Sequence, residues 1–454
     1  MPYKDEGHAM KPMNRRSFLK TALATAASAP LASLLPRAAT AAPGNDYRAL
    51  VCVLLEGGAD SFNMLVPTAS GAYDDYRQLR GEMALARNEL LGLSGTAHGL
   101  HPRLSRLHAL YEQGELAVVA NVGTLKRPLS RDDALAGNDL PANLFSHNSQ
   151  RDMWMTANAR DMQRSGWAGR LADALGGGPF FNISITSRNL MQRGSRDALT
   201  IAEEVYPFDD FYRLRGGDTD LGQPYRQMIL AARQHPNLLV KNFADMRQAE
   251  LELLEAAGGM LEGIETHIEF PTGVDETGRP LGSQLAQVSR LLQARQIPGN
   301  VPGDPPRQIF FVNYHGWDTH NTPLHSDSHL VDYLDESLHA FYQELRILGL
   351  ENQVTTFTIS DFGRSLTPNG SGTDHGWGGH AWVMGGAVSG GIHGTMPAVQ
   401  IDSPDAIDDR VIPTTSVEQY LATLATWLGA DNADIGVVFP NIGSFATMDL
   451  GFMA

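Results

Sequence analysis

Cysteine is nearly absent from this sequence: the chain of 454 residues contains only Cys52. That residue lies inside the apolar run ALVCVLL, which predicts a small buried core residue. One cysteine excludes a framework of disulfides within the chain. Stability must therefore come from a large hydrophobic core, or in part from a bound metal.

Long apolar runs and an excess of basic residues are also lacking. After the N-terminal region no stretch holds eighteen consecutive apolar residues, so we expect no membrane span in the mature chain. The 51 Asp and Glu outnumber the 35 Lys and Arg, giving a formal net charge of −16. Residues 1–41 carry six basic and two acidic residues, so their removal takes the charge to −20. Such an acidic protein is a poor ligand for nucleic acid, and no nucleic-acid partner is expected.

The first forty residues have the pattern of an export signal. Arg15 and Arg16 precede the apolar stretch TALATAASAPLASLL, and a small-residue A-x-A site ends at Ala41. The paired arginines before Ser-Phe-Leu-Lys resemble a twin-arginine signal. We therefore expect cleavage after Ala41, the twin-arginine translocation machinery as partner during export, and a periplasmic or secreted mature protein.

Apolar runs of strand length alternate with helical patterns over residues 42–454. The runs that predict strands are YRALVCVLL, ELAVVANVG, FFNISIT, RQIFFVNYHG, VTTFTISDFG and AWVMGGAV. This alternation predicts an α/β fold, an α/β/α sandwich around a mostly parallel sheet. Residues 221–299 are helical by period and predict a mostly helical segment within it.

Polar side chains follow three of the predicted strands. Asp60 follows the first, Asp318 and His320 follow RQIFFVNYHG, and Asp361 lies at the end of the strand in VTTFTISDFG. In open α/β sheets the functional site lies outside the carboxyl ends of the strands. We therefore expect these four side chains to meet in one cleft with at least one of His375 and His380. Taken alone, each could instead cap a helix or turn.

The stretch SDFGRSLTPNGSGTDHGWGGH, from Ser360 to His380, predicts a glycine-rich loop. A flexible connection needs only polarity and one or two glycines, whereas this stretch gathers Asp374, His375 and His380. The concentration of acids and imidazoles favours a metal site. Arg364 could hold an anionic substrate group through two hydrogen bonds.

The stretch SHNSQRDMW predicts the start of a helix. Ser146 and His147 would lie at its N-terminus, where an anion is favoured. An ordinary N-cap with a surface histidine explains the pattern equally well. On the functional interpretation, both residues are catalytic candidates.

Carboxylate and imidazole together suit a divalent metal, with zinc first and manganese, iron and calcium as alternatives. Two such ions about 4 Å apart could stabilise the attacking and leaving oxygens of a phosphoryl or sulfuryl group. The sequence lacks G-x-S-x-G, a Walker A loop, H-E-x-x-H and a dinucleotide fingerprint. We therefore expect a metal-dependent hydrolase of phosphate or sulfate esters, with a small anionic ester or an anionic glycan as substrate. The alternative is an exported binding or assembly protein that keeps the fold without turnover.

The motifs, in order, resemble those of the DUF1501 family of exported bacterial proteins. The segments that carry the resemblance are LLEGGADSFNMLVP, GLHPRLSRLHALYEQGELAVVANVG, SHNSQRDMW, GWAGRLAD, GWDTH, SDFGRS, TDHGWGG and GGAVSGGIHG. The family is similar, more distantly, to the alkaline phosphatase superfamily, which includes sulfatases. This resemblance implies an alkaline-phosphatase-like sandwich with a metal site at the strand ends.

The superfamily resemblance also implies residue roles. Its first-strand metal aspartate falls on Asp60, and its mid-chain Asp-His pair falls on Asp318 and His320. Its later Asp-His pair falls on Asp361, where Phe362 stands in place of histidine. The missing imidazole could then come from the later stretch that holds Asp374, His375 and His380. For the nucleophile, Ser146 is the first choice and Ser61 the second.

Overall fold

A nine-stranded sheet lies at the centre of the structure, a computed structural model that describes residues 46–161, 163–196, 198–201, 215–216, 219–220, 222–273, 280–320, 326–370 and 372–454. The strand order is β15-β5-β14-β11-β1-β10-β6-β7, with β18 also paired to β5. The strands are β1 (Arg48–Leu55), β5 (Leu116–Gly123), β6 (Asn182–Ser184), β7 (Leu199–Thr200), β10 (Arg307–Tyr314), β11 (Val354–Ser360), β14 (Gly379–Met384), β15 (Gly391–His393) and β18 (Thr415–Ser416). Only β14 runs antiparallel to its neighbours β11 and β5.

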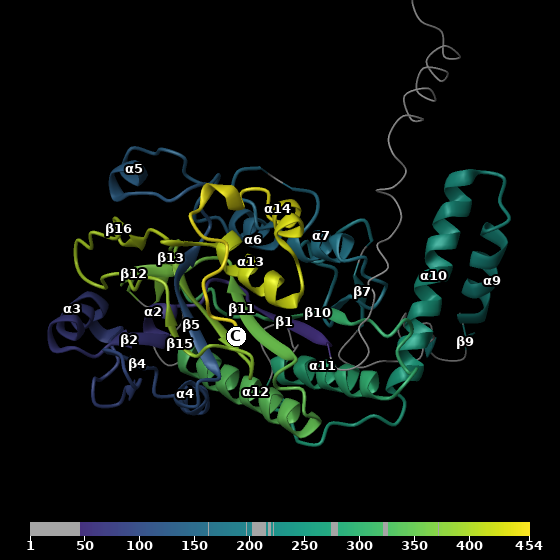
Figure 1. The fold of residues 1–454 in the computed structure, drawn as a ribbon, viewed down its shortest axis with the longest axis horizontal. Helices are drawn as coiled ribbons and strands as arrows, with labels where there is room; N and C mark the ends of the chain where they lie inside the picture. The colour runs from purple at the N-terminus through teal and green to yellow at the C-terminus, as the bar shows by residue number, and fades with distance from the viewer. Residues whose placement is uncertain are drawn as a thin grey trace, which may run out of the picture. The chain divides into compact units, whose positions relative to one another are not determined.

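Helices cover both faces of this sheet, because the central strands are apolar on both sides. In β1, Val51 and Val53 belong to one core cluster, while Leu50, Cys52 and Leu54 belong to another. Helices α4 (Ser105–Glu112), α11 (Leu281–Gln296) and α12 (Ser326–Leu348) cover the first face, and α6 (His147–Thr156), α7 (Trp167–Ala174), α13 (Val417–Leu428) and α14 (Asn432–Val438) cover the second (Figure 1). The predicted α/β/α sandwich with a mostly parallel sheet is confirmed.

Three neighbouring parallel strands bring the predicted strand ends together. Leu55 at the end of β1 pairs with Tyr314 of β10 on one side and with Ser360 of β11 on the other. The residues that follow these three strands therefore emerge at one edge of the sheet. The site is built at that edge.

The segment predicted to be helical contains α9 (Gly222–Ala232), α10 (Leu238–Leu261) and α11. Helices α9 and α10 contact each other as an antiparallel pair, and α10 also contacts α11 (Figure 1). Among the described residues no helix has the length and apolar composition needed to cross a membrane. The predicted signal peptide, residues 1–41, lies outside the described residues.

The glycine-rich stretch differs from the predicted plain loop. It contains an antiparallel hairpin of β12 (Arg364–Pro368) and β13 (Thr373–His375), in which Arg364 pairs with His375. The remaining elements are α2 (Ser61–Met64), β2 (Leu65–Pro67), α3 (Ser70–Arg80), β3 (Leu91–Gly92), β4 (His98–Leu100), α5 (Arg131–Leu135), β8 (Arg215–Gly216), β9 (Thr219–Asp220), β16 (Ala406–Ile407) and β17 (Arg410–Val411), with short 3₁₀ turns at Gly81–Met83 and Ile442–Ser444.

Candidate metal centre

Three histidines from distant parts of the chain meet beyond the carboxyl ends of β1, β10 and β11. His147 is the first residue of α6, His320 lies in the segment after β10, and His375 ends β13. The Nε2 atom of His375 is 2.9 Å from Nε2 of His147 and 2.6 Å from Nε2 of His320. Asp318 completes the group, because its Oδ1 lies 3.1 Å from Nε2 of His320 and 3.5 Å from Nε2 of His375.

The other nitrogen of each imidazole has a hydrogen-bond acceptor. Nδ1 of His147 lies 2.7 Å from Oδ2 of Asp361, and Nδ1 of His320 lies 3.2 Å from Oδ1 of Asp374. Nδ1 of His375 lies 2.7 Å from the carbonyl oxygen of Phe145. A carboxylate or carbonyl oxygen can only accept, so each Nδ1 carries the proton and donates it. In the neutral tautomer each Nε2 then presents a bare lone pair.

Local backbone geometry supports two of these contacts. Phe145 has a positive φ of 71°, which only a well-supported loop maintains for a bulky residue, and its carbonyl meets His375. Gly57 has a φ of 119° and donates its N–H to Oδ2 of Asp361. Asp361 is fully buried, and its Oδ1 has no hydrogen-bond partner among the described residues.

The electrostatics favour a neutral His375 and an ionised Asp318. Burial lowers the pKa of His375, and the neighbouring His147, Arg364 and His320 lower it further. Burial alone would raise the pKa of Asp318, but the hydrogen bond and charge of Arg364, together with the nearby histidines, hold it below its usual value. The hydrogen bonds at Nδ1 therefore direct three imidazole Nε2 atoms toward the ionised carboxylate of Asp318.

This donor set fits a divalent metal. The candidate ligand atoms lie close together: one atom from each of His147, Asp318 and His375 is within 4.8 Å of the other two. His320 joins them through its contacts with Asp318 and His375. Converging lone pairs repel unless a cation lies between them. Imidazole and carboxylate ligands suit zinc, iron or manganese, whereas calcium prefers an all-oxygen shell.

Arg364, which was predicted to hold an anionic substrate group, contacts protein atoms in this structure. It is fully buried, and its guanidinium donates to Oδ1 of Asp318 at 3.0 Å, to the carbonyl of Gly57 at 3.2 Å, and to Thr373. These contacts occupy guanidinium N–H groups that were expected to bind a substrate anion. Arg364 is therefore placed to orient Asp318 and the turn at Gly57.

Asp60 does not join the histidines, which corrects the prediction that it meets them. Arg80 donates to both of its carboxylate oxygens, at 2.9 and 2.8 Å, in a buried ion pair. Asp60 lines a separate cavity of about 410 Å³ that also contacts Trp317 and Thr319. Trp317 and Thr319 line this cavity, whereas Asp318 and His320 contact the histidine group. Alternate residues of this segment therefore belong to different sites.

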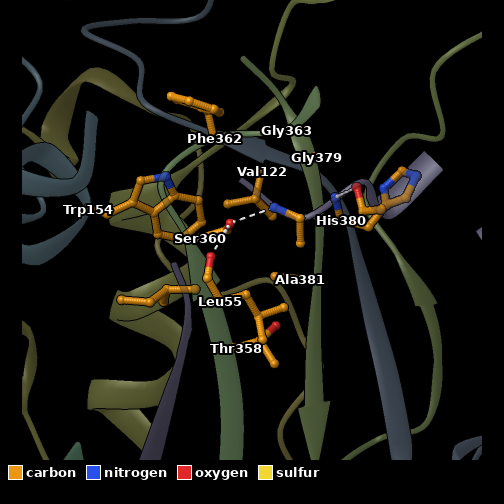
Figure 2. A pocket seen from close by; sticks show the side chains of 13 residues that line it. Leu55, Val122, Trp154, Thr358, Ser360, Phe362, Gly363, Gly379, His380 and Ala381 are labelled. Atoms are coloured by element: carbon orange, nitrogen blue, oxygen red, sulfur yellow. Dashed lines mark hydrogen bonds between the residues drawn. The ribbon is translucent and has the colours of Figure 1, made fainter. Parts of the chain in front are cut away.

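His380 and Ser61 also lie apart from the group. Nδ1 of His380 accepts the backbone N–H of Asn121, and the ring packs edge-on against Phe62. The hydroxyl of Ser61 accepts the backbone N–H of His380. Figure 2 shows His380 on the opposite side of a small cavity, about 20 Å³, from Trp154. The predicted convergence therefore includes His375 but not His380.

Two further predicted residues lie beside the histidines. Asp374 is half-exposed and contacts His320, and the amide of Asn369 holds the pKa of Asp374 below its usual value. Ser146 is the N-cap residue of α6, next to His147, and its side chain makes no capping hydrogen bond. Asp361 contacts His147 as an acceptor, so its role in this geometry is to orient an imidazole.

An open cavity of about 300 Å³ gives access to this centre. It is lined by Glu56, Gly57, His147, Asn148, Arg151, His315, Gly316, Asp318 and Asp361. Glu56 forms ion pairs with Arg151 and with Nδ1 of His315, the latter at 3.0 Å. These three residues were not predicted, although Glu56 and His315 directly follow β1 and β10, as Asp361 follows β11.

A family model described as "Protein of unknown function (DUF1501)" matches residues 47–437. The solved structures that match include the C-terminal periplasmic domain of EcEptC from Escherichia coli in complex with Zn, 13% identical over 88% of each chain with a TM-score of 0.34. The lipoteichoic acid synthase LtaP from Listeria monocytogenes is 8% identical over 90% of this chain and 78% of that chain, with a TM-score of 0.36. A protein in the alkaline phosphatase superfamily from Vibrio parahaemolyticus is 10% identical over 85% of this chain and 67% of that chain, with a TM-score of 0.38. No curated protein matches the chain. Likenesses at these TM-scores support no conclusion about activity.

Proposed function

The chain belongs to the DUF1501 family, and we propose that it is an exported hydrolase of phosphate or sulfate esters that depends on a divalent metal. The observation that carries the proposal is the convergence of three imidazole Nε2 atoms whose Nδ1 atoms all have acceptors. Metal-bound histidine characteristically donates its other N–H to a carboxylate or carbonyl. His147, Asp318, His320 and His375 would be the ligands, with zinc, iron or manganese as the ion.

Charge in the access cavity supports an anionic substrate only when the metal is present. Glu56, Asp318 and Asp361 place three carboxylates around this cavity, against the single guanidinium of Arg151. A bound divalent ion would offset this negative charge and polarise a phosphoryl or sulfuryl oxygen. Arg151 and the N-terminus of α6 would then hold the remaining anionic oxygens. A small anionic ester or an anionic glycan suits this arrangement.

Ser146 remains the proposed nucleophile. Its hydroxyl is not used in capping α6, and it adjoins the proposed ligand His147. It does not line the open cavity, so attack would require a rotation of its side chain toward the metal. Ser61 is a poorer candidate, because its hydroxyl is buried against the backbone of His380.

The test combines metal content with turnover. Protein purified after export without chelator should contain about one equivalent of metal, because the four proposed ligands form one shell. His375→Ala and His320→Ala should lower that content, since each opens the shell. His393→Ala is the matched control, because His393 lies in β15, where it contacts the carbonyl of Ser389 outside the ligand group.

Turnover of aryl phosphates and aryl sulfates should follow metal content across these variants. Ser146→Ala should keep the metal and lose turnover by at least about a hundredfold if Ser146 attacks. Metal binding without turnover over a broad panel of esters and sulfated glycans would favour the alternative, a binding or assembly protein. Wild-type metal content in His375→Ala and His320→Ala would contradict the proposed centre itself.

A further inference from the structure

The hairpin of α9 and α10 exposes a cluster of large apolar side chains. More than half of the exposed large apolar side chains among the described residues lie between residues 228 and 246. They are Met228, Leu230, Leu238, Leu239, Val240, Phe243 and Met246, here called the hairpin tip. Exposed apolar clusters of this kind mark surfaces that another phase or molecule covers.

These side chains are not part of the core of the hairpin. Ile229 and Ala244 are buried instead. An ion pair of 2.7 Å between Arg233 and Asp245 also ties the two helices together. The hairpin is therefore folded with the tip residues left outside it.

The directions of three successive residues decide what kind of partner fits. Leu238, Leu239 and Val240 form the first turn of α10 and are 67%, 78% and 37% exposed. Successive residues of an α-helix project about 100° apart. One flat protein surface would cover one of these directions, whereas immersion of the helix end in an apolar phase covers all three.

The charge near the tip differs from that of the whole chain. The span of the hairpin tip, residues 228–246, contains Arg233, Lys241 and Asp245, a formal net charge of +1 in a chain whose formal net charge is −16. Basic residues beside exposed apolar side chains are typical of helices that lie in the interface of an anionic membrane. Each exposed cation near such a surface adds to the attraction.

We propose that the hairpin tip inserts into the surface of a phospholipid bilayer that contains anionic lipids. The apolar side chains would enter the boundary between headgroups and acyl chains, while Lys241 would lie among the phosphates. The chain would be held on the membrane surface without spanning it. This inference does not depend on the metal centre.

Flotation with vesicles tests the proposal. The assay uses the expected mature chain, from residue 42, which lacks the apolar N-terminal segment. The protein should float with vesicles of phosphatidylcholine and phosphatidylglycerol in a 3:1 ratio (about 25% anionic lipid), and less with phosphatidylcholine alone. The triple variant Leu238→Glu, Leu239→Glu and Phe243→Glu should lose binding by about tenfold or more.

A matched variant separates the effect of the tip from that of added charge. Ile347→Glu, Ile401→Glu and Val437→Glu changes three exposed apolar residues elsewhere and adds the same charge. This variant should float as the wild type does. Equal flotation of the tip variant and the wild type, or no flotation of either, would overturn the proposal.

A spectroscopic measurement reports insertion directly. Cys52 is fully buried, so a dye attached to Leu239→Cys labels the tip alone. The emission of an environment-sensitive dye should shift to the blue on addition of the anionic vesicles, and quenchers on the lipid chains should reduce it. A dimer in light scattering that the triple Glu variant converts to a monomer, with no blue shift on vesicles, would assign the tip to a second copy and refute the membrane assignment.

Discussion

His147 illustrates how one side chain depends on a second for its chemistry. Its Nδ1 donates to Oδ2 of the fully buried Asp361, which also accepts the N–H of Gly57. That arrangement fixes the tautomer and directs Nε2 toward His375 and Asp318. Asp361 is therefore a positioning residue for the proposed metal ligand.

Replacing Asp361 by Asn tests this dependence. The Asn side chain keeps the shape but removes the negative charge that favours the proton on Nδ1 of His147. Metal affinity should fall about 10–100-fold, as for other residues that orient a ligand. Competition with a chromophoric chelator measures it. Asp332→Asn, which changes a partly exposed carboxylate that pairs with Arg103, is the control and should leave the affinity unchanged. An equal affinity in Asp361→Asn would show that His147 does not need this partner.

Several site residues could be predicted from sequence because strand ends align. Asp318, His320 and Asp361 follow strands that the apolar pattern makes recognisable, and His375 lies in a stretch rich in acids and imidazoles. Asp60 was wrongly expected to meet them, because its partner Arg80 belongs to a helix whose position the strand pattern does not predict. The hydrogen bonds that orient the imidazoles depend on tertiary contacts across more than two hundred residues for His147, beyond the reach of any local pattern.

At the scale of elements, the turn after β1 positions the segment after β10. Gly57 has a φ of 119°, and a Cβ at this position would come within 2.8 Å of the carbonyl carbon of Trp317 and closer still to the nitrogen of Asp318. Only glycine combines this backbone conformation with this close approach. The turn therefore determines where Asp318 can lie.

Gly57→Ala should consequently weaken both the fold and the centre. The left-handed backbone alone costs an alanine about 1–2 kcal/mol, and the contact with Asp318 adds to that. We expect a lower melting temperature together with reduced metal content. Gly71→Ala is the matched control: nothing lies within 4 Å of the added Cβ in helix α3, where alanine is favoured by about 1 kcal/mol. A Gly57→Ala protein with wild-type metal content would show that the turn does not position Asp318.

Elements themselves were predicted better than their connections. Ser416 and Gln419, three residues apart, form a capping box at the start of α13, a signal that depends on local sequence alone. The stretch from Ser360 to His380 was expected to be a loop, yet it forms the β12–β13 hairpin. Its pairing depends on close glycine contacts, such as that of Gly363 with Gly378, which no periodicity reveals.

On the scale of the whole molecule, the fold buries histidines in their neutral form. Burial lowers the pKa of His380 to about 3 and, with the charge of Arg103, that of His101 to about 4. Neither residue belongs to the histidine group. The lowered pKa of each therefore affects the free energy of unfolding rather than the proposed metal centre. An unfolded chain exposes both imidazoles to water, where their pKa is about 6.5.

The sign of the resulting pH dependence follows from the proton count. Between about pH 6.5 and pH 4 the unfolded chain binds more protons than the folded chain, so the free energy of unfolding rises with pH. The contribution of these two histidines is fully present above that window and is lost as the pH falls through it. Near pH 5 each of them adds roughly 1.4 kcal/mol per pH unit to the slope.

Replacing His380 by Gln should remove the contribution of one titrating imidazole to the pH dependence of the free energy of unfolding. Gln keeps an acceptor for the backbone N–H of Asn121, which Nδ1 of His380 accepts. Urea denaturation in the presence of a chelator, at several pH values from 5 to 8, measures the free energy of unfolding without a contribution from metal. At pH 8 the variant should be less stable than the wild type, because it packs less well against Phe62. The difference should shrink by roughly 1.4 kcal/mol per pH unit as the pH falls from about 6 to 5, because the wild type alone loses stability by protonating this imidazole. Parallel pH profiles for the two proteins would mean that His380 is protonated equally in the folded and unfolded chains, and would contradict the claim that its burial against Phe62 keeps it neutral.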